Sequence, residues 1–199
     1  MRKIRIFTMT VVTGCLLLPV APASAKPLAS NYVQMKLGGY FPQTNDLDNF
    51  DAGGNVEIGL GHYVAPGFII EGDFGYFETK GRFVSPGFAD FEETFKVVPL
   101  TLSLKGQAFF GQFEPYAEAG IGVYFIKDEL DGTVIAIPIS ESENDAQLGL
   151  HVGLGGNWNI TPQVFLGVEG RYLWLRTDTF GVDVKLDGFF LTANLGYRF

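Results

Sequence analysis

The chain has 199 residues, and its 14 Lys and Arg against 22 Asp and Glu give a net charge of −8 at neutral pH. This acidic balance argues against nucleic acid as a partner, because binding to phosphates requires basic patches. Aromatic residues make up 15% of the chain and glycine contributes 26 residues, which is unusual for a soluble acidic protein.

The amino-terminal residues 1–25 are typical of a secretory signal peptide. Three basic residues precede an apolar stretch over residues 6–20, and Ala23-Ser24-Ala25 provides a small-residue cleavage site. We therefore predict export and cleavage after Ala25, which leaves residues 26–199 as one domain with 11 basic residues, 22 acidic residues and no cysteine. The alternative is a lipoprotein signal ending at Cys15, but the chain stays apolar beyond it.

The remaining chain has no apolar stretch approaching 18 residues, so we predict no transmembrane helix. Instead, eight segments alternate between apolar and polar residues with a period of two, as strands with two different faces do. If such a chain lies in a membrane, only a closed barrel satisfies its backbone hydrogen bonds. In chain order, the segments lie at about residues 33–41, 56–61, 68–76, 98–105, 117–125, 147–154, 163–174 and 189–199.

The terminal segment shows this alternation most fully and ends the chain on an aromatic residue. A strand that closes a barrel in a bilayer would place such a residue at a membrane interface. Its apolar face comprises Phe189, Leu191, Ala193, Leu195, Tyr197 and Phe199, and the opposite face Phe190, Thr192, Asn194, Gly196 and Arg198.

The connections between the segments alternate in length. Short turns are predicted at residues 65–67, 110–113 and 159–162, and longer loops at about 42–54, 78–93, 128–144 and 177–183. Short periplasmic turns and longer extracellular loops are the outer-membrane pattern. The predicted fold class is therefore all-β, an eight-stranded antiparallel transmembrane β-barrel.

Two residues of the fourth segment fit this pattern less well. Pro99 cannot donate a ladder hydrogen bond, so we expect it above the bilayer or at a bulge. Phe95 faces inward by the alternation, which predicts a register shift close to it.

On these features, residues 26–199 resemble the small outer-membrane barrels of the OmpA-transmembrane, OmpX and OmpW type. Pro115–Gly122, Gly170-Arg171-Tyr172 and the terminal Tyr197-Arg198-Phe199 carry the likeness together with the strand pattern. The resemblance implies a porin-like barrel in a Gram-negative outer membrane. It also implies that the barrel-assembly machinery recognises the last strand, through Leu191, Leu195, Tyr197 and Phe199.

The inward-facing positions carry charges of both signs. An eight-stranded barrel is just wide enough for side chains to fill it, and buried charges must pair. The network therefore either plugs the lumen or lines a narrow pore that conducts when pairs exchange partners. We predict that Arg171 pairs with Glu118 in mid-lumen. The network comprises Lys36, Glu57, Glu71, Asp73, Lys105, Glu118, His151, Glu169, Arg171 and Arg198.

No catalytic group, cofactor or metal ligand is predicted, and we expect no enzyme activity. Nucleophilic catalysis needs a base within hydrogen-bonding reach of a nucleophile. Ser103 with His151 is the one lumen-facing pairing of these residue types to test, whereas His62 is expected on the lipid side.

The predicted function is a structural role or weak passage of small solutes through a charge-lined lumen. Alternatives are an adhesin acting through the second and third long loops, with the apolar run 134–139, and an OmpW-like channel for apolar solutes. Expected partners are outer-membrane lipid, lipopolysaccharide and a surface partner of the loops. Divalent cations could bridge lipopolysaccharide to the acidic loop residues Asp46, Asp48, Asp51, Glu78, Asp90, Glu92, Glu93, Asp128, Glu129, Asp131, Glu141 and Glu143.

Overall fold

The computed structural model describes residues 30–44, 50–85, 89–134, 137–179 and 182–199. The predicted signal peptide and its cleavage site lie outside these residues. Within them, no helix is long and apolar enough to cross a membrane. The strands are β1 (Asn31–Pro42), β2 (Gly53–Ala65), β3 (Phe68–Ser85), β4 (Ala89–Gln107), β5 (Phe113–Val134), β6 (Ile137–Asn159), β7 (Val164–Trp174), β8 (Arg176–Thr179), β9 (Val182–Lys185) and β10 (Gly188–Arg198).

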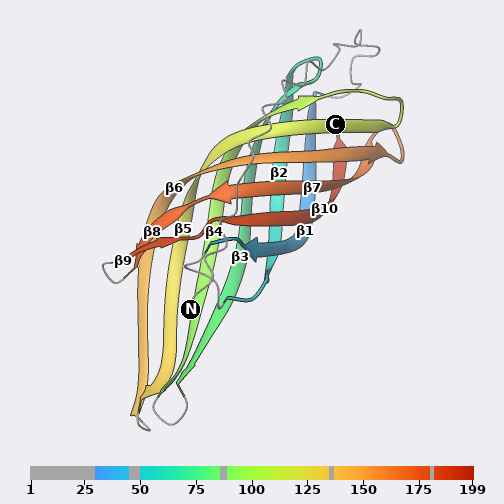
Figure 1. Ribbon diagram of the computed structural model, residues 1–199. Helices are drawn as coiled ribbons and strands as arrows, with labels where there is room; N and C mark the ends of the chain where they lie inside the picture. Colours follow the sequence, from blue (N-terminus) through green and yellow to red (C-terminus); the bar gives the residue numbers. More distant parts are fainter. Residues whose placement is uncertain (1–29, 45–49, 86–88, 135–136, 180–181) are drawn as a thin grey trace, which may run out of the picture.

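Eight of these strands close into a barrel in the order β1-β10-β7-β6-β5-β4-β3-β2, while β8 and β9 form a separate two-stranded sheet (Figure 1). The ladder between β1 and β10 closes the barrel and is antiparallel from Tyr32↔Arg198 to Pro42↔Gly188. The predicted all-β fold class is confirmed.

The two-residue alternation decides which side chains point out of the barrel. On β10, buried and exposed residues alternate along the whole strand. Each large apolar side chain on the outer face gains about 1.5–3 kcal/mol by leaving water, so this face favours lipid. Leu191, Leu195, Tyr197 and Phe199 all point outward and are exposed.

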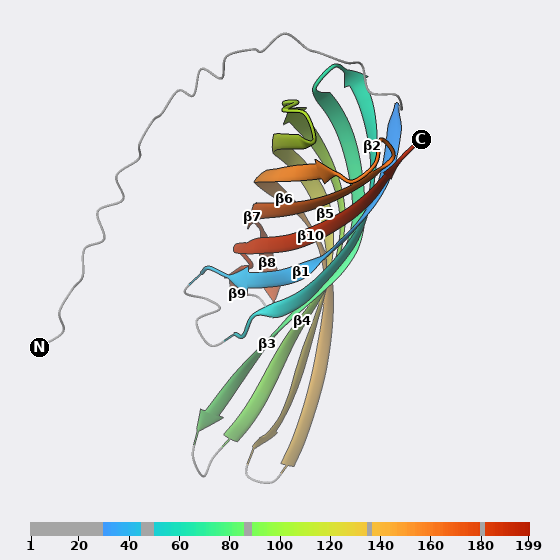
Figure 2. The ribbon, with the colours of Figure 1, turned by 90° about the vertical axis from the view of Figure 1, so that its right-hand side faces the viewer.

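The short turns gather at the end of the barrel where the chain finishes (Figure 2). Pro66 and Gly67 join β2 to β3, and Gly67 has a φ of +78°, which glycine adopts at no steric cost. The turn between β4 and β5 contains Gly111 with a φ of +67°. The three predicted short turns are confirmed.

At the opposite end, β3–β6 extend well beyond the other barrel strands (Figure 2). These four strands have 18 to 23 residues, whereas β1, β2, β7 and β10 have 11 to 13. We call the extended part of β3–β6 the tall wall.

The loops predicted at 78–93 and 128–144 are therefore wrong. Their backbone pairs as far as Ser85↔Ala89 and Val134↔Ile137. Outside the apolar belt both faces of a strand can be polar, so the alternation fades although the ladder continues. Within the predicted loop at 177–183, β8 pairs with β9. The apolar run 134–139 continues β5 and β6, except for residues 135–136, which lie outside the described part.

The register shift predicted near Phe95 is wrong. On either side of Pro99, the β3–β4 ladder keeps one register, with Phe74↔Leu100 before it and Phe77↔Val97 after it. Pro99 lies opposite Tyr124 in the continuous β4–β5 ladder, so it interrupts pairing on one side without a bulge. Phe95 points inward because the normal alternation continues, and it is fully buried.

Candidate functional site in the lumen

All ten residues of the predicted network point into the barrel, and none is more than 6% exposed. They come from every barrel strand, because each strand directs alternate residues inward. β1 contributes Lys36, β2 Glu57, β3 Glu71 and Asp73, β4 Lys105, β5 Glu118, β6 His151, β7 Glu169 and Arg171, and β10 Arg198.

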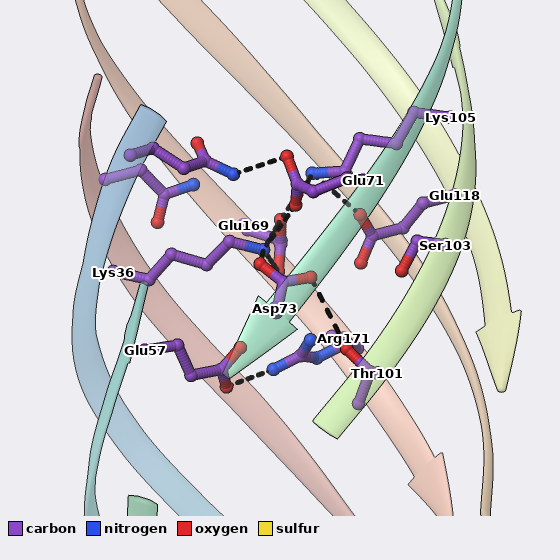
Figure 3. Close-up of polar contacts among 12 residues, drawn as sticks. Lys36, Glu57, Glu71, Asp73, Thr101, Ser103, Lys105, Glu118, Glu169 and Arg171 are labelled. Carbon is purple, nitrogen blue, oxygen red and sulfur yellow. Dashed lines mark hydrogen bonds and ion pairs between the residues drawn. The ribbon is translucent and has the colours of Figure 1, made fainter. Parts of the chain in front are cut away.

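Four of these side chains form a closed ring of alternating charge across the lumen (Figure 3). The Lys36 Nζ lies 2.9 Å from Glu71 Oε1 and 3.2 Å from Glu169 Oε2. The Lys105 Nζ lies 2.7 Å from the same Glu71 oxygen and 3.4 Å from the same Glu169 oxygen. We call Lys36, Glu71, Lys105 and Glu169 the charged ring. It joins β1, β3, β4 and β7.

Neutral side chains donate further hydrogen bonds to the two glutamates of the charged ring. Gln34 Nε2 donates to Glu71 Oε2 at 2.7 Å, and the Tyr32 hydroxyl donates to the same oxygen. The Tyr116 hydroxyl donates to Glu169 Oε2 at 2.8 Å. Sequence reasoning missed these tyrosines, although their inward positions in the alternation could have indicated them.

Two further carboxylates, which are not part of the charged ring, form ion pairs with its lysines. Asp73 Oδ1 lies 3.1 Å from Lys36 Nζ, and Glu118 Oε2 lies 3.0 Å from Lys105 Nζ. With Glu57 and Arg171, this layer of the lumen brings together five carboxylates and three cations. A buried excess of carboxylates attracts cations rather than anions.

The predicted pair of Arg171 with Glu118 is not formed. Arg171 Nη2 donates to Glu57 Oε1, and its guanidinium stacks 5.1 Å from the Phe190 ring centroid. Glu118 instead faces Lys105 directly across the β4–β5 ladder. This register places the ammonium closer to Glu118 than the guanidinium of β7.

A second polar cluster fills the lumen near the short turns. Arg198 donates to Glu114 through Nη2 and to Asn159 Oδ1 through Nη1, the latter at 2.6 Å. Asn159 Nδ2 also donates to Glu114 Oε1 at 2.6 Å. The Arg198 guanidinium lies 4.7 Å from the Phe165 ring centroid, so this arginine is held by charge and by an aromatic face.

Ser103 and His151 meet as the sequence suggested. Ser103 Oγ lies 2.8 Å from His151 Nε2, and both residues are buried. In the described part of the chain, His151 Nδ1 has no hydrogen-bond partner. A catalytic histidine needs an orienting group at this second nitrogen, so the described residues provide a pair and not a triad.

The lumen also contains a metal-like arrangement of three carboxylates. Single oxygens of Glu71, Glu118 and Glu169 lie within 4.8 Å of one another. The Lys105 ammonium contacts all three, at 2.7, 3.0 and 3.4 Å. The lysine thus supplies the positive charge that a metal ion would bring.

Toward the tall wall, the lumen filling changes from charged to apolar. This outer apolar cluster was not foreseen from the sequence. The Tyr40 hydroxyl donates to the Leu186 carbonyl at 2.9 Å, and Leu186 N donates to the Leu175 carbonyl at 2.9 Å. These two hydrogen bonds hold Leu175, just before β8, and Leu186, just after β9, inside the cluster. It comprises Tyr40, Phe77, Phe95, Val97, Tyr124, Ile126, Leu173, Leu175, Leu186 and Phe190.

Comparison with solved structures supports the same architecture. The chain is similar to neisserial surface protein A from Neisseria, with 18% identity and a TM-score of 0.59 over 86% of this chain and 98% of that one. It is also similar to OprG from Pseudomonas aeruginosa, with 14% identity and a TM-score of 0.57 over 86% and 96%. The protease OmpT from Escherichia coli shares 10% identity, with a TM-score of 0.50 over 88% and 98%.

At these identities, the likeness shows the fold alone. A comparison with curated proteins gives no match. The family model for the outer membrane protein beta-barrel domain matches residues 11–199, nearly the whole chain. The chain is therefore a bacterial outer-membrane β-barrel protein and belongs to this family.

Proposed function

We propose that the protein is a closed barrel that acts as a membrane anchor for the tall wall, and that its lumen is not a standing pore. The observation that carries this proposal is the burial of the lumen charges. Each of the ten predicted network residues is at most 6% exposed, and the charged ring spans the lumen from wall to wall. A solute would have to break these pairs, and each broken pair leaves a buried charge without a partner.

Side chains also fill both ends of the lumen, which supports the same conclusion. The Arg198–Glu114 cluster fills the end with the short turns, and the outer apolar cluster fills the other. Passage of an ion through an apolar layer carries a large desolvation cost. We also infer that the protein is not an enzyme, since the Ser103–His151 pair is buried and carries no orienting acid in the part described.

Single-channel recording of the refolded barrel in a planar bilayer tests this function. We expect a silent bilayer from wild-type protein whose folding is verified by heat-dependent gel mobility. Arg171→Ala removes a side chain that lies between the charges and the Phe190 ring but leaves the charged ring and both end clusters in place, so this variant should also stay silent. The matched control is Arg176→Ala, at an exposed position on β8, and it should stay silent.

Discrete current steps from the wild-type barrel would contradict the proposal. If these steps also changed in Arg171→Ala and not in Arg176→Ala, the protein would be a charge-gated pore for small solutes. The excess of carboxylates in the lumen would then make the current cation-selective.

The length of β3–β6 favours a surface-interaction role as the second candidate. Hairpins that extend beyond the lipid belt can present a binding surface without altering the barrel. Removing the paired residues Thr133 and Pro138 with the tip between them shortens the β5–β6 hairpin in register. The shortened protein should fold normally and lose attachment to host cells, whereas unchanged attachment would remove this candidate.

Export remains part of the proposal. We propose that residues 1–25 are removed after Ala25, and amino-terminal sequencing of the protein from outer membranes tests this cleavage. A mature chain that begins with a lipid-modified Cys15 would contradict it.

A further inference from the structure

The chain is held against the inner face of the tall wall just before it enters β2. Phe50 forms an isolated bridge with Gly81 of β3, and Asp51 donates from its backbone N–H to the Lys80 carbonyl at 2.8 Å. The Thr79 hydroxyl donates to the Asp51 carbonyl at 2.7 Å. We call Phe50 and Asp51 the clasp, because they tie the start of β2 to the tall wall.

The Phe50 ring fits against the tall wall because residue 81 has no side chain. A Cβ atom at position 81 would lie 2.7 Å from two carbons of the ring, which is closer than van der Waals contact allows. The ring also packs against Phe95, with 5.4 Å between the two ring centroids, and so contributes to the outer apolar cluster. Removal of the ring from Gly81 would expose this end of the cluster to water.

A carboxyl group lies beside the clasp. Glu93 stands directly opposite Gly81 in the β3–β4 ladder and two residues before Phe95, so it shares the inner face with both. Asp128 of β5 stands opposite Phe95, which makes it the diagonal neighbour of Glu93 on that face. Asp128 is only 2% exposed. Two acids therefore adjoin the surface on which the Phe50 ring rests.

The register brings acids rather than bases to Glu93. Its inner-face neighbours on β3, Thr79 and Gly81, are uncharged, and Leu130 of β5 stands opposite it. The β5–β6 register adds a further acid position, Glu143, opposite Asp128. Burial, and then the charge of Asp128, raise the pKa of Glu93 to about 7. The lysines of these strands take the outward positions of the alternation, namely Lys80, Lys96 and Lys127.

We propose that the clasp is a pH-sensitive contact, which stays closed while Glu93 is protonated and opens when Glu93 ionises. An ionised carboxylate beside Asp128 and under an aromatic ring is poorly hydrated, and water reaches it when the Phe50 ring leaves Gly81. In the open form the pKa of Glu93 returns toward its ordinary 4.5, so a rise in pH through neutrality favours opening. Opening uncovers Phe95 at the outer end of the lumen.

Limited digestion by chymotrypsin tests this contact, because the protease cleaves after Phe50 when the ring has left β3. The full barrel, refolded in detergent, is digested at pH 6 and pH 8, and mass spectrometry quantifies the fragment that begins at Asp51. Rates are divided by the cleavage rate of a short phenylalanine peptide at the same pH. Wild type should be cleaved after Phe50 about fivefold to tenfold faster at pH 8 than at pH 6.

Two variants hold the clasp closed or open. Glu93→Gln stays neutral, so cleavage after Phe50 should be slow at both pH values. Gly81→Ala places a Cβ atom where the ring lies, so cleavage should be fast at both. The matched controls are Glu92→Gln, an exposed position on the outer face of β4, and Gly54→Ala, whose Cβ would meet no atom within 4 Å. Both controls should be cleaved as wild type is, and heat-dependent gel mobility verifies that each variant is folded.

Three outcomes would overturn the proposal. Equal cleavage of wild type at the two pH values would show that the contact does not respond to pH. The same pH dependence in wild type and Glu93→Gln would show that another group causes it. Slow cleavage of Gly81→Ala would show that the contact with residue 81 does not hold Phe50. None of these outcomes depends on whether the lumen conducts or the tall wall attaches to cells, so the proposed function is tested separately.

Discussion

Two regions of the same lumen are filled in opposite ways. In the middle, the charged ring depends on particular contacts, with Glu71 accepting from two lysines, Tyr32 and Gln34. Toward the tall wall, the outer apolar cluster is held together mainly by contact between aromatic and aliphatic side chains. Buried charges need every partner, whereas apolar side chains need only volume. The two regions should therefore respond differently to conservative substitutions.

The largest effect is expected where one carboxylate serves several donors. Glu71→Gln should lower the free energy of unfolding by about 3–5 kcal/mol, because both ring lysines lose a charged partner in a buried site. Glu118→Gln is the matched control, since the side chain of Glu118 is as fully buried as that of Glu71 but contacts only Lys105 among the cations of the described residues. It should cost less than about 1.5 kcal/mol, as it removes one carboxylate from a layer that has too many.

Urea titration of the folded barrel in lipid vesicles, followed by tryptophan fluorescence, gives both values. An equal decrease in the free energy of unfolding of the two variants would mean that contact with two lysines makes Glu71 no more important for stability than Glu118. The stability of the lumen would then depend on its overall balance of charge and not on the particular ion pairs of the charged ring.

A second test compares a conservative change in each region. Leu173→Met in the outer apolar cluster keeps the side-chain volume and should cost less than about 1.5 kcal/mol. Lys36→Arg keeps the charge but replaces a compact ammonium by a larger planar group, so it should cost about 3 kcal/mol. Both residues are fully buried. The same urea titration measures the decrease in the free energy of unfolding for both variants. A smaller decrease for Lys36→Arg than for Leu173→Met would contradict the contrast between the two regions.

The smallest expected effect concerns an acid beyond the apolar cluster, on the tall wall. Burial, and then the nearby charge of Asp128, raise the pKa of Glu93 from its ordinary 4.5 to about 7. Because the folded state resists ionisation of this carboxyl, its stability falls as the pH rises from about 4.5 to 7. Glu93→Gln should therefore stabilise the protein by about 1 kcal/mol at pH 8, after allowance for solvent screening, and change little at pH 4.

Unfolding midpoints of wild type and Glu93→Gln at the two pH values measure this effect. The same difference at pH 4 and pH 8 would show that the substitution acts through packing and not through the charge of Glu93.

The period of two was enough to predict eight strands, the short turns and which charged residues point inward. It could not give the length of β3–β6, because beyond the lipid belt the outward residues become polar, as at Lys96 and Lys127. It also could not assign partners. Arg171 binds Glu57 because of the register around a closed barrel, and a single segment carries no information on that register. The outer apolar cluster escaped prediction since inward aromatics such as Phe95 and Phe190 occupy positions where polar residues were expected.

The charged ring has a consequence for the order of assembly. Lys36 and Glu169 are 133 residues apart, on β1 and β7, and they come within reach of each other only when β10 joins these two strands. In an open sheet their charges would remain hydrated. The pairing of β10 with β1 is thus also the step that dehydrates the lumen, so closure should be abrupt and strongly cooperative rather than a gradual zipping of strands.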